Sequence, residues 1–234
     1  MDRFNQSEFN QFVLENGVVG FFEEPITLKS GRLSHWYVNW RNVAEDVFLI
    51  DKLTDFVIDF IEDLNLKPDC FYGVPEGATK LGILTQYKWA KKSPNYAPHT
   101  HILAMGRGKS KDHGEPKDRY FVGQPKGKTL ILEDVTTTGS SLLETIENLT
   151  GVTGRGVDGV QMIAAVGLTN RMELTNDGKS VKKAVEEKGT LYLQMSNALE
   201  LLPLAYKKLK PREEIAKKVE EEFQKYGVEK LKFL

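Results

Sequence analysis

The hydrophobic and polar positions of this chain follow two alternating periods, which predict alternating strands and helices. Short apolar runs predict buried strands at 69–74, 129–132, 157–168 and 190–194. Apolar residues three and four positions apart predict amphipathic helices around 9–13, 50–65, 81–87, 142–149 and beyond Pro211. Strands that alternate with helices predict an α/β fold with a mainly parallel central sheet flanked by helices.

Other segments carry weaker signals. Residues 26–39 form two strand-like runs around Lys29-Ser30-Gly31-Arg32, which predicts a hairpin with a basic turn. Residues 101–105 predict a further strand, and residues 179–188 a solvated helix. Ser196 is a candidate cap for a helix that contains Leu199 and Leu202. The charged helix after Pro211 is interpreted as packing and is assigned no site.

Length, charge and cysteine content narrow the class of protein. The 234 residues, 40% hydrophobic and 28% charged, suit one globular α/β domain. A net charge of −1 gives no reason to expect nucleic acid or a membrane surface as a partner. The one cysteine, Cys70, excludes an intrachain disulfide, is expected to be buried, and fits a cytoplasmic location. No signal peptide is expected at 1–16, and no apolar run approaches the roughly 18 residues of a membrane span.

The stretch from Leu130 to Ser141 carries the strongest chemical signal. An apolar run is followed by two acids, Glu133 and Asp134, and then by the hydroxyl-rich turn Thr136–Ser141 before a helix. Small residues around Gly139 let backbone N–H groups approach an anion, and the helix start adds unpaired N–H groups. This order predicts a phosphate site with two acids nearby for sugar hydroxyls or a metal ion. The plain alternative is an ordinary turn in which Ser140 or Ser141 caps the helix.

Residues 107–119 are the second informative stretch. No apolar residue lies between Gly106 and Tyr120, so the segment predicts a long exposed loop between strands, able to act as a lid. Its lysines and arginines match the charge of a polyphosphate. A solvated charged loop is the alternative when the stretch is taken alone. For the basic hairpin turn, the alternative is likewise a solvated turn with core aromatics.

These stretches resemble known signatures. The turn after Leu130 is neither a Walker A loop nor a Gly-x-Gly-x-x-Gly loop; it resembles the motif of type I phosphoribosyltransferases that binds 5-phosphoribosyl 1-diphosphate (PRPP). Glu133 stands where Asp is commoner. Lys29-Ser-Gly-Arg-x-Ser34 with the aromatics after it, and Arg107-x-x-x-Lys-Asp-His-Gly-Glu115, resemble two signatures of orotate phosphoribosyltransferases in particular.

The resemblance implies a domain layout and a reaction. It implies one phosphoribosyltransferase domain over 1–234, with an N-terminal hood at about 1–45, a lid loop at 107–119 and a PRPP motif at 130–150. The implied reaction joins orotate to PRPP with Mg²⁺ and gives orotidine 5′-monophosphate and pyrophosphate, within pyrimidine (UMP) biosynthesis. It also implies a homodimer in which the lid loop serves the neighbouring subunit's active site.

The resemblance further assigns roles to residues. The implied catalytic residues are Lys111, His113 and Asp134. The implied substrate-binding residues are Lys29, Tyr37, Val38, Gly77, Ala78, Thr79, Arg107, Lys109, Glu133, Asp134, Val135, Thr136, Thr137, Thr138, Gly139, Ser140, Ser141 and Arg171. Arg171 follows the carboxyl end of a predicted parallel strand, and it is the residue expected to recognise orotate. No side chain is implied as a direct metal ligand, since PRPP would hold most of the Mg²⁺, with water-mediated help from Glu133 or Asp134.

The chain departs from the family's pattern at two places. Gly108 stands where the family commonly has a lysine after the loop arginine, and Lys109 follows one position later. Many relatives also carry a lysine in the turn after the strand at 69–74, where this chain has Glu76-Gly77-Ala78. The nearest lysine there, Lys80, is expected to be a surface residue of the next helix.

Two other functions stay open at this point. One is the same fold with a purine or uracil as the acceptor base, against which the hairpin and Arg171 argue. The other is a PRPP-sensing regulator without catalysis. Such a regulator should lack Lys111 and His113 or carry a nucleic-acid-binding module, and the sequence shows neither change.

Overall fold

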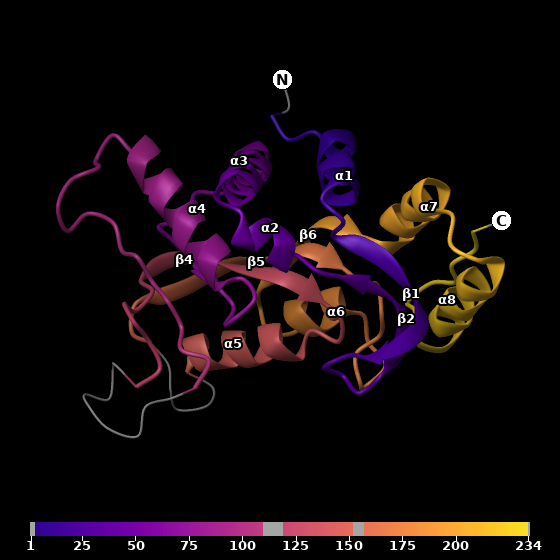
Figure 1. Cartoon of the computed structure of the whole chain (residues 1–234). Helices are drawn as coiled ribbons and strands as arrows, with labels where there is room; N and C mark the ends of the chain where they lie inside the picture. The colour runs from indigo at the N-terminus through magenta and orange to yellow at the C-terminus, as the bar shows by residue number, and fades with distance from the viewer. Residues whose placement is uncertain (1–2, 110–118, 152–156, 234) are drawn as a thin grey trace.

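The computed structural model describes residues 3–109, 119–151 and 157–233 (Figure 1). Its helices are α1 (Gln6–Glu15), α2 (Arg41–Glu45), α3 (Val47–Asp63), α4 (Thr79–Lys92), α5 (Ser140–Thr150), α6 (Val181–Glu186), α7 (Ala198–Leu209) and α8 (Glu213–Tyr226). Its strands are β1 (Val19–Thr27), β2 (Leu33–Val38), β3 (Cys70–Gly73), β4 (Gly127–Thr136), β5 (Val160–Asn170) and β6 (Leu191–Asn197). The predicted α/β class is confirmed.

The central sheet is parallel, with the strand order β3-β4-β5-β6. In β4, Leu130, Ile131 and Leu132 are fully buried, as expected of a strand that helices cover on both faces. The strands predicted from the four apolar runs are all present. Strand β4 continues through Glu133 and Asp134 to Thr136, so both acids lie at the carboxyl end of the sheet.

Successive side chains along the central strands point to opposite faces of the sheet and pack into two separate core layers. Leu130 and Leu132 pack in one layer with residues of α1 and α3, whereas Ile131 packs in the other with Leu142 and Ile146 of α5. Figure 1 shows α1 to α4 on one face of the sheet and α5 and α6 on the other. Each fully buried aliphatic side chain contributes about 1.5–3 kcal/mol to folding, so these layers hold the strand ends in place.

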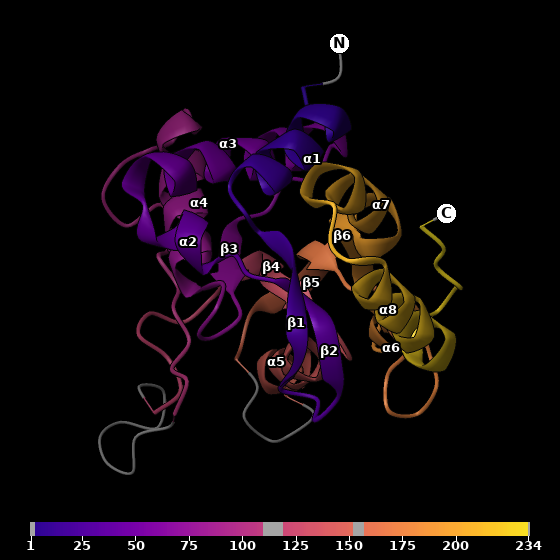
Figure 2. The same ribbon diagram turned by 45° about the vertical axis from the view of Figure 1, so that its right-hand side comes forward.

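The hairpin β1–β2 forms a separate antiparallel sheet beside the main one. Its turn contains Gly31 at φ +80°, a left-handed conformation that glycine adopts without strain. Helices α7 and α8 lie along the hairpin (Figure 2), and Trp36 stacks on Phe223 with ring centroids 5.9 Å apart. The predicted hairpin is confirmed, and the helix after Pro211 packs against it.

The strand predicted at 101–105 is wrong. The segment forms one isolated bridge, between Gly106 and Phe121, and Met105 shares backbone hydrogen bonds with the two residues after Phe121. Leu103 is 50% exposed, so one face of the segment lacks a covering layer. A short two-stranded pairing of this kind is marginal, and the lid therefore does not lie between regular strands.

The cap predicted for α7 is also wrong by one residue. Asn197 is the N-cap, and its side chain accepts a hydrogen bond from the backbone N–H of Glu200 at 3.1 Å. Ser196 still belongs to β6, where its hydroxyl donates to the Leu168 carbonyl at 2.8 Å. Cys70 is buried as predicted. Across the described ranges, none of the helices combines the length and the hydropathy needed to cross a membrane.

Candidate active site

A cavity of about 780 Å³ lies between the hairpin and the carboxyl ends of β3, β4 and β5. This is where open α/β sheets bind their ligands. Of the predicted site residues it is lined by Lys29, Tyr37, Val38, Gly77, Glu133, Asp134, Val135, Thr137, Thr138, Gly139, Ser140, Ser141 and Arg171. A larger hollow, of about 1200 Å³, lies between α3 and the loop after α4, and none of the predicted site residues that the structure describes lines it. The smaller cavity is therefore the candidate active site.

The hydroxyl-rich turn Thr136–Ser141, called the phosphate loop below, opens α5 without a side-chain cap. Gly139 occupies the N-cap position at φ +72°, and neither Ser140 nor Ser141 caps the helix. The alternative of an ordinary serine-capped turn is therefore wrong. Because no side chain caps them, the N–H groups of the first turn are available to an anion at the positive end of the helix dipole.

Lys29 joins the hairpin to the phosphate loop. Its Nζ donates a hydrogen bond to Ser141 Oγ at 2.8 Å, although the two residues are 112 positions apart. The basic turn thus lies beside the start of α5 and not free in solvent. An ammonium group and the open helix start together form an anion-binding corner of the cavity.

The paired acids are buried at the end of β4. Glu133 is 7% exposed, and its Oε2 has no hydrogen-bond partner among the described residues. Burial raises the pKa of Glu133 well above its usual range, and the charge of Asp134 raises it further, while Lys29 opposes both. Burial also raises the pKa of Asp134, against hydrogen bonds from backbone N–H groups and the charges of Arg41 and Lys29. An unpartnered buried carboxylate is costly, so this pair is suited to a ligand that supplies donors.

We expect Glu133→Gln to stabilise the ligand-free protein above about pH 6. A carboxyl whose pKa is raised on folding loses stability as pH rises from its usual value, about 4.3, through the folded value. Glutamine does not ionise, so the advantage of the variant in unfolding temperature should grow from about pH 4 to pH 8.

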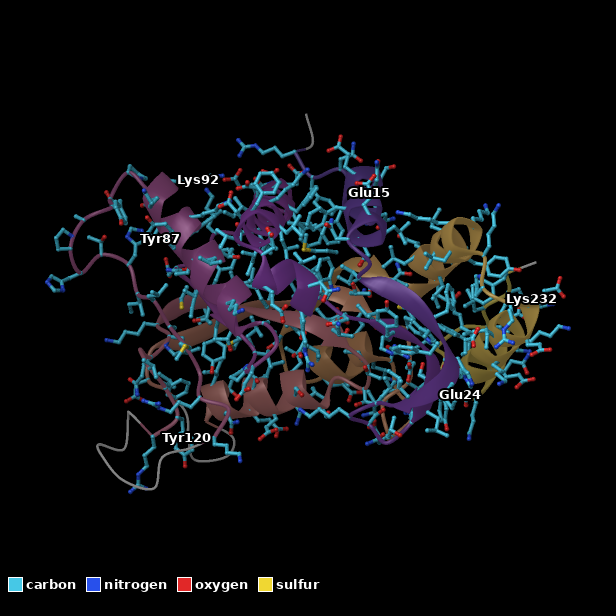
Figure 3. All side chains as sticks on the ribbon, viewed as in Figure 1. Glu15, Glu24, Tyr87, Lys92, Tyr120 and Lys232 are labelled. Atoms are coloured by element: carbon cyan, nitrogen blue, oxygen red, sulfur yellow. The ribbon has the colours of Figure 1, made fainter. Side chains whose placement is uncertain are left out.

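Thermal unfolding across that pH range tests the expectation. Glu24→Gln is the matched control, since Glu24 lies exposed on the outer side of β1 (Figure 3) and should leave the profile unchanged. If Glu133→Gln unfolds at or below the wild-type temperature at pH 8, the ionised Glu133 does not destabilise the ligand-free protein.

Arg171 lies under the hairpin at the end of β5. It is 2% exposed, its Nε donates to Glu173 Oε1 at 2.8 Å, and its Cζ lies 3.6 Å from the centre of the Trp36 ring. Burial lowers the pKa of Arg171, and Glu173 opposes that shift. Further hydrogen bonds go to Ser34 Oγ at 2.9 Å and the Trp36 carbonyl at 3.4 Å. Among the described residues, three of its five N–H groups are thus engaged, which leaves two for a ligand in the cavity that it lines.

Comparison with known proteins decides the family. No family model matches the chain. An orotate phosphoribosyltransferase from Methylococcus capsulatus is 31% identical over 183 residues, which cover 78% of this chain and 78% of that protein. This chain belongs to the orotate phosphoribosyltransferase family.

Solved structures of orotate phosphoribosyltransferases share the fold. The enzyme from Francisella tularensis superposes with a TM-score of 0.63 at 23% identity and covers 94% of this chain and 99% of its own. The Mycobacterium tuberculosis enzyme, solved in complex with PRPP, superposes with a TM-score of 0.54 at 18% identity, over 84% of this chain and 98% of its own. At these identities the likeness supports the fold alone.

The resemblance implies that the turn after β3 contacts pyrophosphate, and in the structure one residue of the predicted three, Gly77, lies at the cavity. A Cβ added at Gly77 would lie 2.5 Å from Asp134 Oδ2, so the backbone of the turn packs directly on that carboxylate. Ala78 is the N-cap of α4 and Thr79 its first residue, and neither lines the cavity. Lys80 donates to the Ala44 carbonyl at 3.1 Å, as expected of a surface helix lysine.

Of the lid at 107–119, the structure describes residues 107–109 and 119. Arg107 lines a cavity of about 180 Å³ that shares Lys29 and Ser141 with the candidate active site. Lys109 is exposed and lines neither. Thr136, the first residue of the phosphate loop, is buried, and its hydroxyl lies 2.6 Å from that of Tyr192. The predicted catalytic residues Lys111 and His113 lie outside the described residues.

The two departures from the orotate phosphoribosyltransferase pattern lie against each other. A Cβ added at Gly108 would meet the carboxylate of Glu76, which belongs to the turn after β3. In this chain the carboxylate of Glu76 faces a glycine, which leaves room for it.

We therefore expect Gly108→Lys to change the KM for PRPP by less than about 2-fold, since Glu76 would pair with the new ammonium group. In a Glu76→Gln background the same lysine should lower that KM by about 2- to 5-fold, a coupling of about 0.5–1 kcal/mol. Steady-state kinetics of the four proteins gives the coupling, and Gly108→Gln controls for side-chain bulk. Equal effects of the lysine in both backgrounds would show that Glu76 and position 108 act independently.

Sequence reasoning missed several residues around the site. Arg41, at the start of α2, lines the cavity and lowers the pKa of Asp134. Glu173 and Ser34 hold Arg171. The only sequence signal for Arg41 was its place two residues after Asn39, since a five-residue helix such as α2 leaves no periodic pattern.

Proposed function

We propose that this chain transfers the 5-phosphoribosyl group from PRPP to orotate, giving orotidine 5′-monophosphate and pyrophosphate in de novo pyrimidine biosynthesis. One observation carries the proposal: a single cavity is lined by the phosphate loop, the paired acids and Arg171. A sugar phosphate and an acidic base need these three kinds of partner at once. The membership in the orotate phosphoribosyltransferase family supports the same reaction.

PRPP would extend across the acids. Backbone N–H groups and hydroxyls of the phosphate loop, with Val135 before it, would bind the 5′-phosphate. Glu133 and Asp134 would accept hydrogen bonds from the ribose hydroxyls, which also gives the unpartnered Oε2 of Glu133 a donor. The backbone of Gly77 would serve the pyrophosphate, whereas the N–H groups of Ala78 and Thr79 already donate to the carbonyls of Val74 and Glu76.

Orotate would lie under the hairpin. Tyr37 and Val38 line the cavity from β2, and Tyr37 packs on Phe22 with ring centroids 4.7 Å apart. The remaining N–H groups of Arg171 would bind the carboxylate or a carbonyl of the base, because a planar guanidinium matches such oxygens in pairs. Its stacking on Trp36 fixes the plane in which it can do so.

The chemistry follows from charge. Breaking the anomeric C–O bond leaves positive charge on the ribosyl ring and negative charge on the departing pyrophosphate. Lys29, Arg107, Lys109 and Lys111 would stabilise the pyrophosphate, and Asp134 would lie close to the ring on which positive charge develops. His113 would donate a proton or hydrogen bond to the leaving group. Closure of the lid would exclude water, which otherwise hydrolyses PRPP.

Mg²⁺ fits the donor set as an ion carried by the substrate. Within the described residues no group of three or more potential ligands could hold a metal by itself. Two carboxylates at the cavity, one with an unpartnered oxygen, can still accept hydrogen bonds from metal-bound water. When bound, Mg²⁺ would supply neutralisation of the diphosphate charge. Glu133 and Asp134 would orient that complex through water.

We also propose a homodimer of single-domain subunits over 1–234, with the hood at 1–45 and the lid at 107–119 serving the neighbouring subunit. Large apolar side chains lie exposed near the start of α3 and along α4, where Val47 is 84% and Phe48 74% exposed. Tyr87, on the outer side of α4 (Figure 3), is 50% exposed. Such a patch is typical of a protein–protein interface. The buried free thiol of Cys70 fits the cytoplasm as the location.

The direct test follows orotate absorbance in the presence of PRPP and Mg²⁺, with uracil and hypoxanthine in parallel. Loss of absorbance with orotate alone supports both the reaction and the base. Turnover of uracil or hypoxanthine instead would favour another base specificity. No turnover of any base, with PRPP still binding in calorimetry, would favour the PRPP-sensing regulator and contradict the proposal.

A further inference from the structure

A chain of buried polar contacts runs from Arg171 to the C-terminal helix α8. Arg171 NH2 donates to Ser34 Oγ at 2.9 Å, and Ser34 Oγ lies 2.9 Å from Glu222 Oε2. Ser34 is 1% exposed, and the Glu222 side chain is 15% exposed. Glu222 does not line the active-site cavity. Among the described residues, the hydroxyl of Ser34 forms the hydrogen-bonded link between Glu222 and Arg171.

The carboxylate of Glu222 is itself held in place. Its Oε1 accepts a hydrogen bond from the backbone N–H of His35 at 2.7 Å and lies 2.9 Å from His35 Nδ1. Both oxygens are thus engaged on β2, one by Ser34 and one by His35. Helix α8 itself is fixed by its buried apolar stripe, Ile215, Val219 and Phe223. The helix consequently presents one rigid carboxylate to the hairpin.

The orientation of the Ser34 hydroxyl depends on that carboxylate. Ser34 Oγ has one hydrogen and two acceptors at 2.9 Å, Glu222 Oε2 and the Trp36 carbonyl. A carboxylate is the stronger acceptor, so the hydrogen lies toward Glu222 and the lone pairs of the oxygen remain for Arg171. The charge of Glu222 also raises the pKa of Arg171, after the larger effects of burial, which lowers it, and of Glu173.

We propose that Glu222 is a positioning residue for base recognition, acting on Arg171 through Ser34. Glu173 accepts a hydrogen bond from one edge of the Arg171 guanidinium, and the Trp36 ring packs on its face. The contact with Ser34 fixes the other edge, and so sets where the two remaining N–H groups point. The inference rests on the proposed role of Arg171 in binding orotate. It gives α8, which the sequence marked as packing alone, a part in specificity.

The test compares Glu222→Gln with Glu221→Gln, an exposed neighbour on the same helix. Glutamine keeps the shape of Glu222 but removes its charge, so the KM for orotate should rise about 10-fold, the effect expected from one hydrogen bond to a charged group. The preference for orotate over uracil in kcat/KM should fall by a similar factor. The KM for PRPP should stay within about 2-fold, and Glu221→Gln should match the wild type.

A double-mutant cycle isolates the path. If Glu222 acts through Ser34, Glu222→Gln should add less than about 2-fold to the defect of Ser34→Ala. Glu222→Asp, which keeps the charge on a shorter chain, should restore part of the orotate preference. Two outcomes would overturn the inference and leave Glu222 with a structural role in the hairpin. One is a double variant whose defect equals the product of the two single defects. The other is an equal rise of the KM for orotate and the KM for PRPP with an unchanged preference for orotate.

The two proposals fail in different ways. A wild-type protein that turns over no orotate refutes the proposed function before any variant is made. A wild-type protein that prefers orotate, together with a Glu222→Gln variant of unchanged preference, refutes only the role of Glu222. If Glu222→Gln does not fold, Glu222→Asp and Ser34→Ala carry the same comparison.

Discussion

Lys111→Ala is expected to lower turnover by at least about 100-fold while leaving PRPP binding largely intact. An ammonium group that meets the departing pyrophosphate acts on charge that develops only in the transition state, and such groups contribute about 10²–10³ in kcat. The expectation rests on the loop signature Arg107–Glu115, since Lys111 itself lies outside the described residues.

Single-turnover kinetics and calorimetry with PRPP separate the two effects for Lys111. Lys126→Ala serves as the control, because Lys126 is an exposed lysine just before β4 and outside the cavity lining. If Lys111→Ala turned over at the wild-type rate, the loop lysine would have no place in the mechanism. A loss of PRPP affinity equal to the loss of kcat/KM would instead assign Lys111 to ground-state binding.

Gly77→Ala should reduce kcat/KM by about 100-fold with little change in unfolding temperature. The added methyl would lie 2.5 Å from Asp134 Oδ2 and 2.7 Å from its Cγ, so the carboxylate has to move by about an ångström. A displacement of that size at a reacting group costs about 100-fold in rate. Gly77 is exposed and its φ is not in the left-handed region, so alanine itself strains neither the core nor the backbone.

The cause can be checked in an Asp134→Ala background. Asp134→Ala removes the short contact, so adding Gly77→Ala to it should lower kcat/KM by less than about 3-fold. A full 100-fold loss from Gly77→Ala in that background would mean that the turn acts on the pyrophosphate directly and not through Asp134. A large fall in unfolding temperature would instead show that the turn supports the fold.

Much of the architecture followed from local pattern. The buried parallel strands and the long helices could be predicted because each repeats one period over enough residues to stand out, as in α3 and β4. The segment 101–105 was misread because an apolar run does not show whether a partner covers both of its faces. The cap of α7 was misplaced because Ser196 and Asn197 are both capping residues, and the end of β6 decides between them.

The residues of the candidate site also differ in whether the sequence alone could predict them. The residues of one contiguous motif, Glu133 to Ser141, could be assigned from sequence because strand, acids, turn and helix start follow one another along the chain. The contact of Glu76 with Gly108 could not, since a turn and a lid meet there only in the folded state. Neither could the pairing of Arg171 with Glu173 and Ser34.

By itself, then, the sequence determined the fold class, the phosphate loop and the kind of chemistry, because these depend on residues close together in the chain. The tertiary structure alone decided that Lys29 lies on Ser141 and that Glu222 of α8 supports Arg171 through the hairpin. The physical reason is that hydrogen bonds and burial act between neighbours in space. Partners more than a hundred residues apart leave no periodic trace in the sequence.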